Sequence, residues 1–75
     1  MLLSELAMQQ KAEIIAVKAR GRQRRRLLDL GFVPGAEIKA LRKSPLGDPA
    51  AYLIKGTVLA LRKEETDLIE IRRKV

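Results

Sequence analysis

Turns rich in glycine and proline divide much of this 75-residue chain into short apolar segments, and this limits the folds open to it. Pro34–Gly35, the PLGDP stretch at 45–49 and Lys55–Gly56 all have the composition of turns. The segments around them are rich in isoleucine, valine and leucine. The strands that they predict are residues 11–19, 36–44, 50–54, 57–62 and 68–73. About five strands at such regular spacing predict a mainly β fold, a small, partly open SH3-like barrel forming a single domain over residues 1–75.

One α-helix is expected after the first strand, at residues 22–30. Leu27 and Leu30 are three residues apart and therefore share one face of this helix, which can pack on the barrel. Gly31 stands where a left-handed C-terminal cap would fall, and Pro34 prevents the helix from continuing. The sequence thus predicts a short helix inserted between the first two strands.

Two single helical turns are also expected. Ser4 can cap the first turn, near the N-terminus, and residues 63–67 form the second. Three acids, Glu64, Glu65 and Asp67, fall in that second turn. They could serve a hard cation, but basic neighbours and the preference for acids at a helix N-terminus explain them better. We therefore expect no metal site here.

The core must be aliphatic, because the chain has 12 Leu, 6 Ile and 4 Val but only one Phe and one Tyr. It has no Cys and no His, which excludes disulfides, thiolate zinc sites and imidazole ligands. Ser4 and Ser44 are the only serines, and no glycine-rich phosphate loop is present. The sequence therefore predicts a protein that is not an enzyme and carries no cofactor.

The N-terminal stretch MLLSELAMQQ is too polar for a signal peptide, and it has no basic lead-in. No apolar run approaches the roughly 20 residues that span a bilayer. We expect a soluble, cytoplasmic protein that reaches a membrane only through a partner.

Nearly all of the net charge of +7 lies in residues 18–26, which contain six basic side chains and no acid. Three interpretations are open for this run: a solvated helix face, a contact surface for protein or phosphate, or a nucleic-acid site. A nucleic-acid site is disfavoured because basic residues are not spread over several elements and few aromatics are available for stacking. We select Arg22, Arg24 and Arg25 as the basic rim of a candidate partner-binding site. Arg25 can also pair with Asp29, worth about 0.3 kcal/mol.

Two leucines are candidate apolar anchors for the same partner. Leu28 lies about 100° around the helix from Leu27, so the small core cannot easily bury both. Leu46 lies in the PLGDP loop. This loop is either a simple rigid turn or a pre-organised loop that presents Leu46 to the partner. An apolar patch with a basic rim is the composition of a protein contact site.

Taken together, RRRLLDLGFVPGAEIKAL, PLGDP and GTVLALRKEETDLIEI resemble the FeoA family, the small accessory proteins of bacterial ferrous iron transport. The resemblance runs from Leu3 to about Arg72, and the order and spacing of LLDLGFVPG and PLGDP carry it. It implies an SH3-like barrel with an inserted helix. It also implies a partner, FeoB, the membrane transporter with an N-terminal GTP-binding domain, and a family-level link to transition metal ions.

One position departs from the family pattern, and several functions stay open. Family members often carry Pro-Gly before the first strand, where this chain has Met8–Gln9, so a positive φ at Gln9 would be strained. The expected function is a cytosolic adaptor that binds the cytosolic part of FeoB. The alternatives are a nucleic-acid-binding small barrel and a stand-alone regulatory domain like the C-terminal domain of metal-dependent repressors. Whether the adaptor activates, inhibits or assembles the transporter stays open, and exposed sheet edges allow a homo-oligomer.

Overall fold

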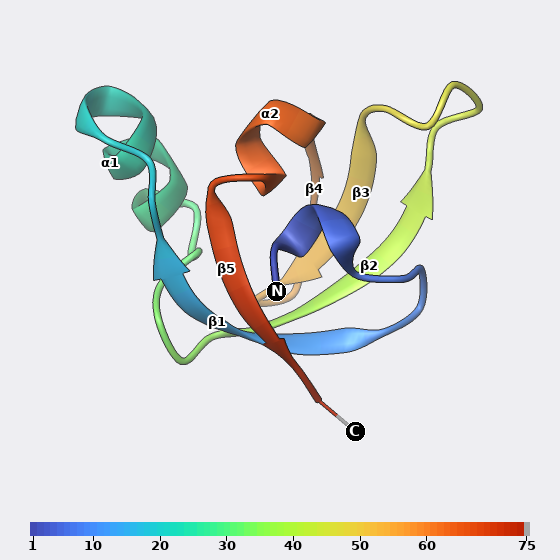
Figure 1. Cartoon of the computed structure of the whole chain (residues 1–75), viewed down its shortest axis with the longest axis horizontal. Helices are drawn as coiled ribbons and strands as arrows, with labels where there is room; N and C mark the ends of the chain where they lie inside the picture. Colours follow the sequence, from blue (N-terminus) through green and yellow to red (C-terminus); the bar gives the residue numbers. More distant parts are fainter. Residues whose placement is uncertain (75) are drawn as a thin grey trace.

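The computed structural model describes residues 1–74, which form one five-stranded antiparallel sheet with strand order β4-β3-β2-β1-β5 (Figure 1). The elements are η1 (Leu3–Glu5), β1 (Lys11–Val17), α1 (Gly21–Asp29), β2 (Glu37–Lys43), β3 (Ala50–Ile54), β4 (Thr57–Leu61), α2 (Lys63–Thr66) and β5 (Ile69–Arg73). Every predicted strand and helix is present, with ends within two residues of those expected. The predicted mainly β, SH3-like architecture is confirmed.

The sheet curves around its core, and α1 lies at one end of it (Figure 1). Two irregularities in register allow the curvature: one in β1 between Ile14 and Ala16, the other in β2 between Ala40 and Arg42. The first also interrupts the alternating burial of β1, because the buried residue that follows Ile14 is Val17, three residues later instead of two.

The core is aliphatic, as the composition predicts, with Phe32 as its largest fully buried side chain. β2 and β3 contribute alternate residues to it, as a sheet with one buried face requires. The N-terminal segment also contributes, because Leu3 and Leu6 are both buried. Full burial of a leucine is worth about 1.5–3 kcal/mol, so η1 is an integral part of the domain.

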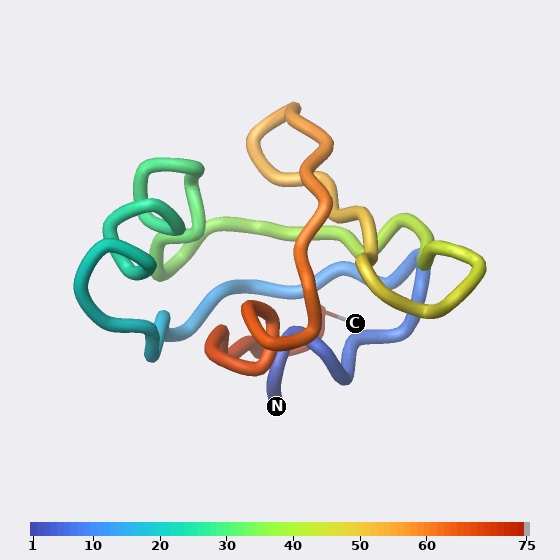
Figure 2. Tube along the Cα trace, turned by 90° about the horizontal axis from the view of Figure 1, so that it is seen from above, coloured from blue at the N-terminus to red at the C-terminus, as the bar shows by residue number. Residues whose placement is uncertain are grey.

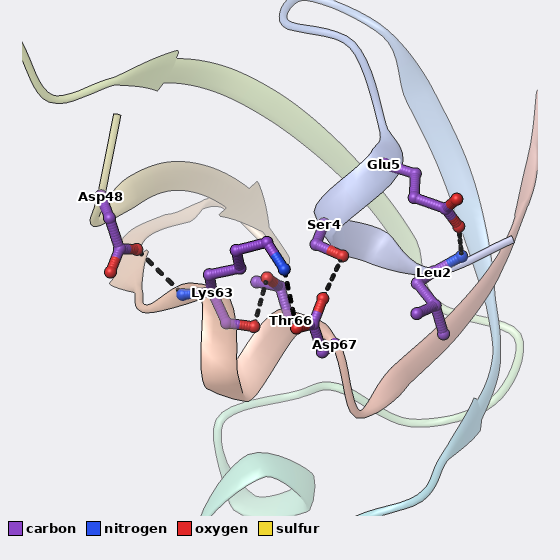
Figure 3. A network of polar contacts seen from close by, with 7 residues as sticks. All are labelled: Leu2, Ser4, Glu5, Asp48, Lys63, Thr66 and Asp67. Carbon is purple, nitrogen blue, oxygen red and sulfur yellow. Dashed lines mark hydrogen bonds and ion pairs between the residues drawn. The ribbon is translucent and has the colours of Figure 1, made fainter. Parts of the chain in front are cut away.

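The expected capping role of Ser4 is wrong. Leu2 occupies the N-cap position of η1, and the Glu5 carboxylate accepts the Leu2 N–H at 2.6 Å. Ser4 lies inside η1 and donates its hydroxyl hydrogen to Asp67, just after α2 (Figure 3). The Ser4 hydroxyl therefore bonds to Asp67 instead of capping η1, and this bond links the N-terminal turn to a residue 63 positions further along the chain.

Gln9 adopts the left-handed conformation, with φ of 71°. Its N–H donates to the Ala40 carbonyl at 2.6 Å, and its side-chain amide donates to the Leu41 carbonyl at 2.7 Å. These bonds to β2 hold the turn before β1 in a conformation that favours glycine. The strain expected at Gln9 is therefore present.

Candidate functional site

Helix α1 is fixed to the barrel at its C-terminal end. The Phe32 N–H donates to the Leu27 carbonyl and the Gly31 N–H donates to the Leu28 carbonyl, both at 3.0 Å. Gly31 has φ of 107°, and Leu27 and Phe32 are both fully buried. This is a Schellman motif with its hydrophobic contact, and it confirms the predicted glycine cap. The last turn of α1 is thereby held against the core.

The N-terminal end of α1 is electrostatically unfavourable. Arg20 occupies the N-cap position without a side-chain capping bond, and the first turn contains no acid. Arg22 follows within that turn, where the helix dipole repels a cation by a few tenths of a kcal/mol. An anionic partner would relieve this repulsion.

An open hollow of about 600 Å3 lies along the outer face of α1. Its lining residues are Gly21, Arg22, Arg24, Arg25, Leu28 and Asp29. Gly21, Arg25 and Leu28 stand three or four residues apart, so one stripe of the helix forms it. Leu28 is half-buried and packs partly against the core, while the remainder of its side chain faces the hollow. The structure thus brings four of the five predicted partner-binding residues together.

The arginines of this surface differ in how they are held. Arg24 is tied to the barrel, because its guanidinium donates to the Val17 carbonyl at the end of β1 at 2.8 Å. Within residues 1–74, Arg22 and Arg25 make no side-chain hydrogen bond or ion pair. The pair expected between Arg25 and Asp29 is absent from the ion pairs of these residues, and that expectation is wrong. Of the arginines that line the hollow, Arg22 and Arg25 are therefore the ones available to a partner.

Leu46 lies far from this surface. The loop between β2 and β3 is at the opposite end of the molecule from α1 in both Figure 1 and Figure 2. The loop is closed by backbone bonds, from the Ser44 N–H to the Pro49 carbonyl at 3.0 Å and from the Gly47 N–H to the Ser44 carbonyl at 2.8 Å. Leu46 projects from it and is 95% exposed. Leu28 and Leu46 therefore cannot belong to one small contact patch.

Two of the three acids at α2, Glu65 and Asp67, are engaged in contacts that stabilise the fold. Arg26 pairs with Glu65. Asp67 accepts bonds from Ser4 and from the Lys63 ammonium, the latter at 3.0 Å (Figure 3). The Ser4 hydroxyl and Lys63 lower the pKa of Asp67. Partial burial acts to raise the pKa of Glu65, but the bonds from Arg26 and the Arg62 N–H outweigh it and lower that pKa. No group of three potential metal-ligating side chains occurs in the described part of the chain.

Two functional contacts of the arginine run were missed by sequence reasoning. Arg26 joins α1 to α2 through Glu65, 39 residues away, and Arg24 bonds to a backbone carbonyl. Neither contact has a local sequence signal, because each depends on how the fold places α1 against another element.

The helices of residues 1–74 include none with the length and apolar character needed to cross a bilayer.

Comparisons with known proteins give a consistent result. The model of the FeoA domain family matches residues 1–73. A Fe(2+) transport protein A/Fe(2+) transporter FeoB fusion protein of Porphyromonas gingivalis is 41% identical over 71 residues, which are 95% of this chain but 8% of the fusion. The chain thus spans less than a tenth of that relative's length.

Two solved structures are also similar. The FeoA protein of Chlorobium tepidum is 43% identical, with a TM-score of 0.94, and the match covers all of this chain and 71% of that one. The FeoA of Stenotrophomonas maltophilia, crystallised with zinc and described as an SH3 domain protein, is 35% identical with a TM-score of 0.84. That match covers 95% of this chain and 88% of the other.

Proposed function

Because this chain belongs to the FeoA domain family, we propose that it acts in ferrous iron transport as a non-enzymatic adaptor. It binds the cytosolic part of a FeoB-type transporter and therefore works in the cytoplasm, at the membrane only through that partner. The Porphyromonas gingivalis relative supports the pairing, because there a FeoA segment and a FeoB transporter share one chain. Fusion holds two modules at a high effective concentration, which suits partners that otherwise meet by diffusion.

The docking surface is the hollow along α1. The observation that carries this proposal is the combination of two arginines, Arg22 and Arg25, with a half-buried Leu28 in one stripe of the helix. Neither arginine has a side-chain partner within residues 1–74. The uncapped, basic start of α1 adds to the positive field there. Such a surface suits an acidic partner face with an apolar side chain that covers Leu28.

Binding to a FeoB-type transporter in nanodiscs tests this surface. Arg25→Glu should slow association, most strongly at low salt, because rim charges act mainly on the approach of the partner. Arg42→Glu is the matched control: it makes the same charge change at an exposed residue of β2 away from the hollow. Arg24 is a poor test residue, because its loss would also remove the bond to the Val17 carbonyl.

The apolar anchor is tested by truncation. Leu28→Ala should speed dissociation and cost about 1–3 kcal/mol of binding free energy. Thermal melting of the variant must show a folded domain, since Leu28 also packs against the core. Leu46→Ala, at the far loop, should leave binding unchanged. If Leu46→Ala weakens binding and Leu28→Ala does not, the docking surface is the PLGDP loop and not α1.

A further inference from the structure

The strand β4 forms an open edge of the sheet. It pairs with β3 from Ile54↔Thr57 to Ala50↔Leu61 without a register shift, and it is the last strand in the sheet order. In Figure 2 the β3–β4 hairpin rises away from the rest of the trace. Within residues 1–74, no other strand pairs with the outer side of β4.

The backbone groups on this outer side belong to Val58 and Ala60. The two-residue turn at Lys55–Gly56, with φ of 49° and 78°, makes Ile54 and Thr57 the bonded pair that closes the hairpin. Bonded and non-bonded pairs alternate along an antiparallel ladder. The N–H and C=O groups of Val58 and Ala60 therefore point away from β3.

This edge lacks the features that normally prevent edge pairing. The sequence of β4, TVLAL, contains no charge and no proline, and its ladder with β3 contains no bulge. Val58 is 52% exposed and lies beside Leu53, its cross-strand partner on the same face.

The other edge of the sheet is protected. Strand β5 carries Glu70, Arg72 and Arg73, and the N-terminal segment covers part of its outer side. Leu2 forms a bridge with Glu70, and the Ile71 N–H donates to the Met1 carbonyl at 2.7 Å. The contrast isolates β4 as the unprotected edge.

We propose that a second copy of this chain pairs with β4 antiparallel across a two-fold axis at Leu59. In this register Val58 of one copy faces Ala60 of the other, and each such pair exchanges both of its backbone bonds. Leu59 faces Leu59 of the second copy, and two sheets become one continuous sheet. The pairing is isologous, as a two-fold dimer requires.

Charge favours this edge over other surfaces as the place where two copies associate. The chain has a net charge of +7, so two copies repel each other wherever unpaired cations face one another. β4 is an uncharged stretch of surface, and its own sequence is the complement that the register needs. A strand of this length buries less than a standard interface, so we expect a dissociation constant of about 0.1–1 mM.

A concentration series of the full chain by analytical ultracentrifugation and two-dimensional amide NMR tests the dimer. Wild type should shift from monomer to dimer between about 0.05 and 2 mM, at the dissociation constant given above. Concentration-dependent shifts should centre on residues 57–61 and on the neighbouring β3. Monomer throughout this range, or shifts centred on α1 or another element, would overturn the proposal.

Two variants distinguish pairing through β4 from non-specific self-association. Val58→Lys places a charge on the edge, and Ala60→Pro removes an outward N–H without touching the ladder to β3; both should abolish dimerisation with the fold intact. Leu46→Lys makes the same charge change at the more exposed Leu46 and should leave the dimer unchanged. The reverse pattern, loss of the dimer in Leu46→Lys but not in Val58→Lys, would also contradict the proposal.

Discussion

Gln9 holds a backbone conformation that most side chains avoid, and the domain compensates for it with two bonds to β2. Replacing Gln9 by Ala removes the side-chain bond to Leu41 but keeps the backbone strain. Replacing it by Gly removes the bond and also relieves the strain. We therefore expect Gln9→Gly to be more stable than Gln9→Ala by about 1 kcal/mol in the free energy of unfolding.

Urea unfolding of the two variants at one pH measures this difference directly. Both variants lack the side-chain hydrogen bond, so the difference between their free energies of unfolding reports the strain of the backbone conformation. Equal stability of the two variants would show that position 9 carries no strain.

Residues whose role is set by the local backbone could be predicted from the sequence. Gly31 and the Lys55–Gly56 turn take the positive φ values that their positions suggest. The sequence also predicts a capping role for Ser4 and a pair between Arg25 and Asp29, and both predictions are wrong. A local partner is only one option for a polar side chain, and the sequence does not show which distant groups the fold will offer it.

At the scale of elements, α1 and α2 are joined by the pair between Arg26 and Glu65, and this pair makes stability depend on pH. The pKa of Glu65 is lowered in the folded state, so the folded state favours the ionised carboxylate. The stabilisation is therefore present above the unfolded pKa, near 4.5, and is lost as the pH falls through the lower folded value.

Glu65→Gln should consequently destabilise the domain by about 0.5–1 kcal/mol at pH 7, and the loss should vanish at strongly acid pH. Thermal melts of wild type and variant across the acid range measure the gap. Glu64→Gln is the matched control, since Glu64 is exposed and makes no ion pair among residues 1–74. A gap that stays constant with pH would show that Glu65 acts by packing and not by its charge.

The elements themselves could be predicted because each has a local pattern, such as LLDL followed by Gly31 for α1 or the turn between β3 and β4. The assembly of the candidate site was predictable in part, since Arg22, Arg25 and Leu28 share one helix. The separation of Leu46 from that helix was not, because it depends on the path of β2 across the sheet (Figure 1).

At the scale of the whole molecule, the side chains able to coordinate a metal ion predict weak metal binding. The chain has neither Cys nor His, and Glu65 and Asp67 are already engaged with other side chains. Anaerobic titration with Fe2+ should therefore show a dissociation constant no tighter than about 1 mM, as for scattered surface carboxylates. A stoichiometric micromolar site would contradict this expectation and favour a metal-sensing domain.

The distribution of charge over the molecule also limits nucleic-acid binding. Three of the six cations in residues 18–26 are engaged: Lys18 with Glu70 at 3.4 Å, Arg26 with Glu65, and Arg24 with a backbone carbonyl. Arg20, Arg22 and Arg25 remain free for phosphates within the described residues. Six phosphate contacts would give a log–log salt slope of about −5, and three give about −3.

We therefore expect binding to duplex DNA to be indifferent to sequence and to weaken with salt at a slope of about −3. Fluorescence anisotropy with two unrelated duplexes over a range of salt concentrations measures both properties. Arg22→Glu combined with Arg25→Glu should flatten the slope by about 2, because each lost phosphate contact removes about 0.9. Arg42→Glu, outside the α1 hollow, should change it less. Sub-micromolar binding to one defined sequence at physiological salt would contradict the adaptor proposal, because the three arginines without a partner in the described residues, at the start and along one short helix, cannot supply that affinity by charge alone.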